Sequence, residues 1–109
     1  YELSEAFTKG AKIEYNQQEA LKDADFVYVK NWSCYHDYAK IACTDSSWML
    51  TNEKMRVTNN GKVMHCLPVR RNVEISDEVL DGPNSLILQQ ANNRLFSAQA
   101  VLKKMLESI

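Results

Sequence analysis

The sequence predicts an α/β fold in which a parallel sheet carries helices on both faces. Short apolar runs rich in β-branched residues alternate with segments whose apolar residues recur every three or four positions, the pattern of β-α-β units. The strands are continuously apolar, as expected where both faces of a sheet are covered. The 109 residues are 45% hydrophobic and 25% charged, which suits one globular domain or part of one.

Three apolar runs are the predicted strands of this sheet. The strongest is Phe26–Val29, which is aromatic and β-branched throughout, a composition enriched in strands. Val63–Cys66 and Leu86–Leu88 are the predicted second and third strands. Lys12–Tyr15 alternates polar and apolar residues, which predicts a further short strand.

Capping residues and helical spacing place the helices around these strands. Ile75 and Leu80 occupy the two positions of a hydrophobic staple at the start of one helix. The predicted helices are 2–9 before Gly10, 17–23 after Asn16, 52–58 after Thr51 or Asn52, 77–81 after Ser76, and 92–107. The apolar stripe of the last helix consists of Leu95, Ala98, Leu102, Met105 and Ile109.

Charge and cysteine usage exclude several classes of protein. The net charge of -1 gives no drive toward nucleic acid or membranes, and no apolar run approaches the roughly 20 residues of a membrane span. Cys34, Cys43 and Cys66 lack the spacing of a disulfide framework, so reduced thiols in a cytoplasmic protein are the simpler interpretation. Cys34, His36 and Cys43 lack a paired motif and a fourth ligand, so no metal site is predicted.

Unusual polar residues follow the three predicted strands. Ligands of parallel sheets bind just beyond the carboxyl ends of the strands, so the chemistry is expected in segments 30–38, 67–73 and 89–94. The second segment belongs to the most informative run of the chain, 65–72, which reads His-Cys-Leu-Pro-Val-Arg-Arg-Asn. Here a buried strand delivers a histidine and a cysteine to its carboxyl end.

The residues of this run indicate an anion site. Pro68 forces Leu67 out of helical conformation, which leaves the Leu67 carbonyl free to face a ligand. Arg70 and Arg71 are able to grip a carboxylate or phosphate with two parallel hydrogen bonds. From these residues alone, an anion site beside a thiol and a pair of solvated arginines near a buried cysteine are equally good interpretations.

A family resemblance favours the first interpretation. His65–Pro68 matches the H-C-L-P signature of ornithine carbamoyltransferases, and its continuation to Asn72 resembles the N-acyl-ornithine branch. Asn92–Arg94 resembles the E-N-R segment before the final helix of that family, and Phe26–Trp32 resembles the strand and loop of the succinylornithine enzymes. Three motifs in the right order resemble the C-terminal portion of such an enzyme, which implies a partial Rossmann-like domain.

The resemblance implies roles in binding carbamoyl phosphate. Cys66 and Leu67 match residues that contact carbamoyl phosphate and the attacking amine, and Arg94 matches an arginine that polarises its carbonyl oxygen. Cys66 and Arg94 are therefore the candidate catalytic residues. Pro68 and Leu67 match a cis peptide bond in a structural turn. The alternative, purely structural interpretations are that Cys66 is a small buried residue and that Arg94 pairs with a carboxylate. The role of His65 stays open.

The resemblance also implies an acyl-ornithine site. Arg70 and Lys30 match residues that bind acylated ornithine, whereas Arg71 is more simply explained by a structural salt bridge. Ordinary ornithine enzymes carry S-M-G after the corresponding strand, but residues 30–35 read Lys-Asn-Trp-Ser-Cys-Tyr. This departure counts against free ornithine as the substrate.

The implied reaction is transfer of the carbamoyl group of carbamoyl phosphate to the δ-amine of N-succinylornithine or N-acetylornithine in arginine biosynthesis. No metal or organic cofactor is implied, and the family works as homotrimers. Residues 1–109 would form an acyl-ornithine-binding domain that is incomplete, because family chains are much longer and its first β-α unit is expected to be absent. The N-terminal carbamoyl-phosphate domain is also expected to be absent, since its S-T-R-T-R phosphate motif does not occur here. The isolated chain is expected to be inactive. The alternatives are carbamoylation of ornithine or another amine, and a noncatalytic scaffold.

Overall fold

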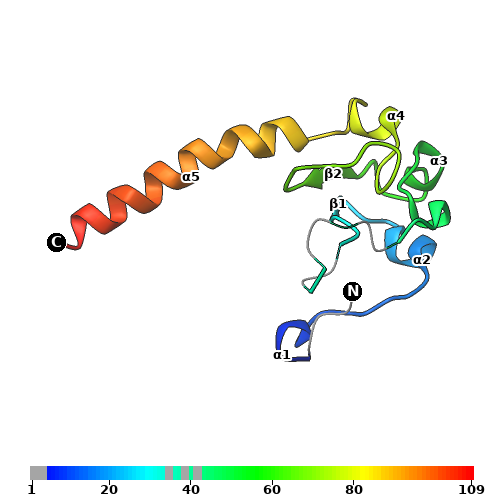
Figure 1. Cartoon of the computed structure of the whole chain (residues 1–109), viewed down its shortest axis with the longest axis horizontal. Coiled ribbons are helices and arrows are strands. Elements are labelled where there is room, and N and C mark those ends of the chain that lie inside the picture. Colours follow the sequence, from blue (N-terminus) through cyan, green and yellow to red (C-terminus); the bar gives the residue numbers. More distant parts are fainter. Residues whose placement is uncertain (1–4, 34–35, 38–39, 41–42) are drawn as a thin grey trace.

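The computed structural model describes residues 5–33, 36–37, 40 and 43–109. A compact body holds the sheet and most of the short helices, and the last helix extends away from it as a long arm (Figure 1). The Cα atoms span 51 × 33 × 29 Å. The elements are α1 (Glu5–Thr8), α2 (Gln17–Leu21), β1 (Phe26–Val29), a 3-10 turn (Ser46–Trp48), α3 (Asn52–Met55), β2 (Lys62–His65), α4 (Asp77–Leu80) and α5 (Ile87–Glu107).

The sheet confirms the predicted parallel arrangement. β1 and β2 pair in parallel from Phe26 opposite Lys62 to Val29 opposite His65. Val63 and His65 on β2 are each only 1% exposed. The prediction that both faces of β1 are covered was wrong within this chain, because Phe26 is 65% exposed and Tyr28 is 55% exposed. No described residue of this chain packs closely enough over that row of side chains to bury it.

The predicted third strand at Leu86–Leu88 was wrong. Its place beside β2 is taken by a single bridge between Val63 and Ser85, after which the chain enters α5 at Ile87. Three apolar residues do not distinguish a strand from the first turn of a helix. The residues from Gln89 onward contain no helix breaker, so the helix predicted from residue 92 extends back through the run.

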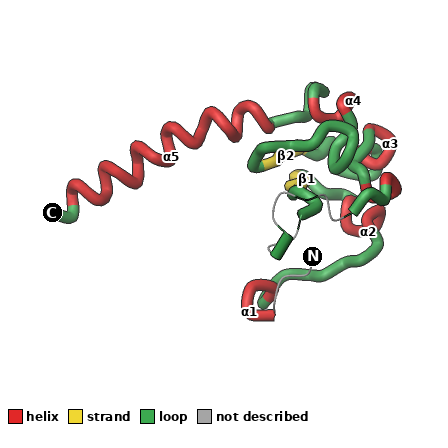
Figure 2. Tube along the Cα trace, in the orientation of Figure 1, coloured by secondary structure: helices red, strands yellow, loops and turns green. Residues whose placement is uncertain are grey.

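Figure 2 shows the helices other than α5 as short segments. Their starts largely follow the predicted caps: the Asn16 side chain accepts from two backbone amides at the start of α2, and the Thr51 side chain accepts from one, that of Lys54, in α3. Both helices end earlier than predicted, at residues 21 and 55. Of the predicted helix 2–9, residues 5–8 are helical and 2–4 lie outside the described residues. The strand predicted at Lys12–Tyr15 was wrong, since that segment is irregular.

The core is formed by side chains from β2, α2, α4, the first turn of α5 and the loops beside them. Ile75 and Leu80, the predicted staple pair, are 0% and 8% exposed. The buried apolar residues are Leu21, Leu50, Val63, Ile75, Val79, Leu80 and Ile87.

The long helix α5 contributes only its first turn to this core. Ile87 is buried, whereas Leu95, Leu102 and Met105 of the predicted stripe are all more than half exposed. An apolar face of this kind on a helix is normally covered by a partner surface. Within the described part of the chain, no helix is long and apolar enough to cross a membrane.

Candidate active site

A hollow of about 370 Å³ opens at the carboxyl end of β2, where the chemistry was expected. It lies between the end of that strand and the first two turns of α5. This is the position at which α/β sheets bind ligands. Its lining residues are His65, Cys66, Leu67, Gln90, Ala91 and Arg94.

A lysine stands beside the thiol of this hollow. Val29 and His65 pair at the ends of the two parallel strands, so the residues that follow them, Lys30 and Cys66, are brought together. The Lys30 Nζ atom lies 3.7 Å from the Cys66 Sγ atom. The parallel register therefore joins two residues that are 36 positions apart in the chain.

The backbone turns sharply as it leaves β2. The Leu67–Pro68 peptide bond is cis, as predicted, and Leu67 has a φ of 57°. The Leu67 amide donates to the Nδ1 atom of His65 over 2.9 Å. Because Nδ1 accepts this bond, the proton of neutral His65 resides on Nε2.

His65 and Glu74 form a buried pair behind the hollow. Both side chains are fully inaccessible, and the Nε2 atom of His65 lies 3.6 Å from Oε1 of Glu74. Burial lowers the pKa of His65; the Glu74 carboxylate opposes that shift and the Lys30 ammonium adds to it. The same Glu74 oxygen accepts the Arg70 backbone amide over 2.8 Å. The pair therefore holds both the start and the middle of the turn after β2.

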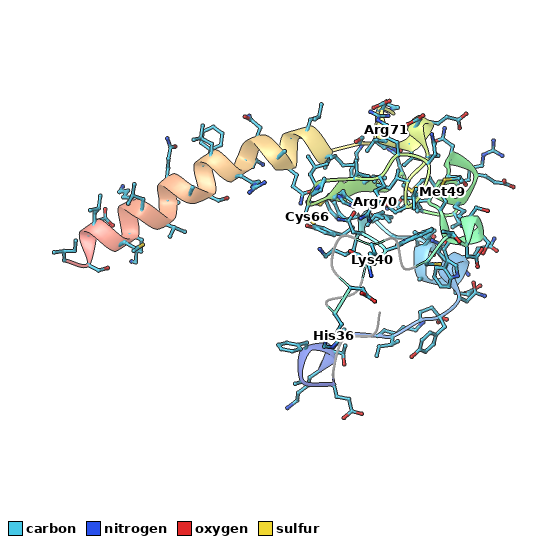
Figure 3. The ribbon with its side chains drawn as sticks, in the orientation of Figure 1. His36, Lys40, Met49, Cys66, Arg70 and Arg71 are labelled. Carbon is cyan, nitrogen blue, oxygen red and sulfur yellow. The ribbon has the colours of Figure 1, made fainter. Side chains whose placement is uncertain are left out.

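The two arginines of the turn have different surroundings. Arg71 donates to Asp77 over 2.7 Å and to both carboxylate oxygens of Asp81, which confirms its predicted structural salt bridge. These hydrogen bonds raise the pKa of Arg71 further and lower that of each aspartate. Arg70 lies between Arg71 and Cys66 in Figure 3. It is not among the described residues that line the hollow.

A family comparison accounts for this arrangement. Residues 2–105 match the model of the Asp/Orn binding domain of aspartate/ornithine carbamoyltransferases. The chain belongs to the aspartate/ornithine carbamoyltransferase family. Among its relatives, the N-succinylornithine carbamoyltransferase of Bacteroides fragilis is 45% identical across the whole chain. The ornithine carbamoyltransferase of Methanosarcina acetivorans is 39% identical across 95% of it.

Solved carbamoyltransferase structures share the fold. A crystal structure of N-acetyl-L-ornithine transcarbamylase superposes with a TM-score of 0.73 and 33% identity, covering 89% of this chain and 32% of that one. The ornithine carbamoyltransferase from Pyrococcus furiosus gives a TM-score of 0.73 and 30% identity, covering 89% of this chain and 33% of that one. The chain spans 35% of the length of the Bacteroides relative and 36% of the Methanosarcina one.

This member of the family thus brings most of its predicted site residues to one place. Cys66, Leu67 and Arg94 line the hollow, and Lys30 reaches the Cys66 sulfur. Arg70 joins them indirectly, because its amide is bound by the carboxylate that faces His65.

Two residues of the site were missed from the sequence. Gln90 lines the hollow, four positions before Arg94 on α5, a spacing that would have placed both on one helix face. It was overlooked because segment 86–88 was predicted as a strand. Glu74 carries no local signal, since it becomes buried only through tertiary packing.

The three residues weighed and rejected as a metal site, Cys34, His36 and Cys43, lie only partly within the described residues. Cys34 is not among the described residues, whereas His36 and Cys43 are. Within the described ranges, no group of three or more histidine, cysteine, aspartate or glutamate side chains is arranged to hold a metal ion.

Proposed function

We propose that this chain supplies the ornithine-side half of the active site of an N-acyl-ornithine carbamoyltransferase. The reaction would transfer the carbamoyl group of carbamoyl phosphate to the δ-amine of N-succinylornithine or N-acetylornithine, in arginine biosynthesis in the cytoplasm. The observation that carries the proposal is the hollow in which Cys66, Leu67 and Arg94 meet at the end of β2. The names of the relatives support the same class of reaction.

The charges around the hollow suit an anionic donor. Arg94 lines it, and the Lys30 ammonium lies at its thiol. The Glu74 carboxylate is fully buried and faces the His65 imidazole, and it is not among the residues that line the hollow. The open side of the hollow is therefore cationic, as a phosphate-bearing ligand requires.

The proposed chemistry needs positioning more than acid-base machinery. The neutral δ-amine attacks the carbonyl carbon, the C–N bond forms, and the bond to the phosphate oxygen breaks. The departing phosphate takes the proton that the amine loses. Arg94 would stabilise the charge that grows on the carbonyl oxygen. The Leu67 carbonyl and the Cys66 sulfur would orient the nitrogen atoms of the reactants, and Cys66 forms no covalent intermediate.

An acylated ornithine is the proposed acceptor. Lys30 and Arg70 are the two cations that would bind its carboxylate and acyl groups. The segment after β1 lacks the S-M-G sequence of ordinary ornithine enzymes, so the site proposed here does not hold the free α-amine. Carbamoylation of ornithine or another amine is the competing assignment, and a noncatalytic scaffold is the third.

The 109-residue polypeptide is proposed to be inactive by itself. It contains no S-T-R-T-R sequence, so the main phosphate cradle must come from elsewhere. The exposed stripe of α5 would pack against that further domain, and the complete enzyme would be a homotrimer. Turnover by the isolated polypeptide at the rate of the full-length protein would contradict this.

The experiment is a carbamoylation assay of the full-length protein with N-succinylornithine, N-acetylornithine and ornithine as separate acceptors. Efficient turnover of an acylated substrate and little turnover of ornithine is the expected result. Arg94→Ala should lower kcat by roughly 10²–10³-fold, the cost of losing one oxyanion donor. Arg70→Ala should instead raise the KM for the acyl-ornithine. A preference for ornithine would refute the assigned substrate, and absence of carbamoyl transfer would favour the scaffold.

A further inference from the structure

Gln90 takes the place of a missing strand at the outer edge of β2. In this strand Val63 and His65 direct their backbone groups away from β1. Both outward backbone groups of Val63 have backbone partners: its amide donates to the Asn84 carbonyl, and its carbonyl accepts from the Leu86 amide. The next outward amide, that of His65, donates instead to the Oε1 atom of Gln90 over 3.0 Å. The chain has already entered α5 at this point, so a side chain completes the ladder.

The other end of the Gln90 side chain reaches β1. A backbone amide only donates, so the carboxamide must turn its oxygen toward His65 and its nitrogen the other way. That nitrogen lies 3.1 Å from the hydroxyl oxygen of Tyr28, to which it donates. One side chain therefore links α5, β2 and β1. A buried amide such as that of His65, which is 1% exposed as a residue, is costly to leave without a partner.

This link lies next to the arginine that the proposed reaction needs. Gln90 and Arg94 are four residues apart on α5, so they occupy the same face one turn from each other. Both line the hollow together with Cys66. Beyond Ile87 the described residues of α5 are exposed or only partly buried, so its direction is set by the contacts of its first turns with β2, the Gln90 link among them.

We propose that Gln90 is a positioning residue, which fixes the first turns of α5 on the sheet and thereby sets the Arg94 guanidinium against Cys66. The inference rests on the proposed function. Misplacement of a reacting group by about 1 Å costs on the order of a hundredfold in rate. A shift of the first turns of α5 after loss of the Gln90 hydrogen bonds should therefore lower kcat measurably.

The test is Gln90→Met in the full-length protein, which keeps the length of the side chain and removes its hydrogen bonds. Gln89→Met is the matched control, because Gln89 is the neighbouring, exposed glutamine of the same helix turn. We expect Gln90→Met to lower kcat by roughly ten- to a hundredfold, with a much smaller change in KM, and Gln89→Met to match the parent.

A double-mutant cycle separates positioning from general support of the fold. If Gln90 acts by placing the guanidinium, Gln90→Met should cause little further loss in an Arg94→Lys background, because neighbouring residues that act together are not additive. An equal loss in both backgrounds would overturn the inference, as would a rate equal to that of Gln89→Met. Should Gln90→Met not fold, Tyr28→Phe removes only the outer bond, and a smaller loss that also depends on Arg94 is expected.

Hydrogen exchange at the His65 amide distinguishes this inference from the proposed function. Faster exchange in Gln90→Met than in Gln89→Met is expected, and unchanged exchange would show that the link is not made. A parent without carbamoyl transfer would remove the proposed function, and with it the catalytic role of Gln90. An active parent with faster exchange but an unchanged rate would overturn the inference alone.

Discussion

Removal of the buried Glu74 carboxylate should destabilise the turn that carries the site. Glu74 is 1% exposed, and one of its oxygens accepts the Arg70 amide over 2.8 Å and faces the His65 imidazole at 3.6 Å. Glu74→Ala leaves that amide without its acceptor and opens a cavity beside the imidazole. Glu74→Gln keeps the volume and a carbonyl oxygen for Arg70, and removes only the charge.

The magnitude follows from these contacts. An unsatisfied buried donor costs about 1–3 kcal/mol, and a lost hydrogen bond to a charged group about 1.5–3 kcal/mol. Part of this is offset because a desolvated carboxylate is removed as well. We therefore expect Glu74→Ala to lower the free energy of unfolding by about 3 kcal/mol, and Glu74→Gln by about 1 kcal/mol.

Urea unfolding followed by tryptophan fluorescence measures both values. Glu78→Ala is the control, because Glu78 is an exposed glutamate on the neighbouring helix α4 and should change stability by no more than about 0.5 kcal/mol. If Glu74→Ala resembled this control, the buried carboxylate would not support the turn. A loss from Glu74→Gln as large as that from Glu74→Ala would show that the charge, and not the acceptor, is what matters.

Two further predictions concern stability. Burial lowers the pKa of His65 from its usual 6.5. On acidification the unfolded chain therefore binds a proton at His65 before the folded chain does. The free energy of unfolding should fall as the pH drops through 6.5 and level off below the folded-state pKa of His65. His65→Gln should flatten this slope in urea titrations between about pH 7.5 and 5.5, about one unit on either side of the usual pKa of 6.5. An unchanged slope would contradict the assignment. Lys54 donates to Gln17 over 2.6 Å and to the Met49 carbonyl over 2.9 Å, so Lys54→Met should cost about 1–3 kcal/mol in the same assay, and a neutral effect would mean that these bonds are not formed in solution.

The local elements were predictable because their signals are local. Asn16 and Thr51 cap helices with side-chain bonds made within three residues, and Phe26–Val29 has the composition of a strand. The turn around Pro68 follows from the geometry of proline and from the motif that resembles carbamoyltransferases. Residues that directly follow the strands, such as Lys30 and Cys66, could also be placed, since parallel register brings the strand ends together.

The remaining features depend on contacts that the sequence does not state. Segment 86–88 is apolar enough for a strand, yet only the preceding residue, Ser85, makes a single bridge to β2 before the helix begins at Ile87. Gln90 became part of the site only because that strand is missing and the His65 amide needed an acceptor. The burial of Glu74 depends on packing between the turn and the core. Exposure of Phe26 and Tyr28 arises because no described residue of this chain buries them.

The most direct test is a crystal structure of the full-length protein with carbamoyl phosphate bound. We expect the ligand to occupy the hollow at the end of β2, with its carbonyl oxygen within hydrogen-bonding distance of the Arg94 guanidinium and its nitrogen facing the Leu67 carbonyl and Cys66. Density for carbamoyl phosphate at another place, with Arg94 turned away from it, would contradict the proposed site.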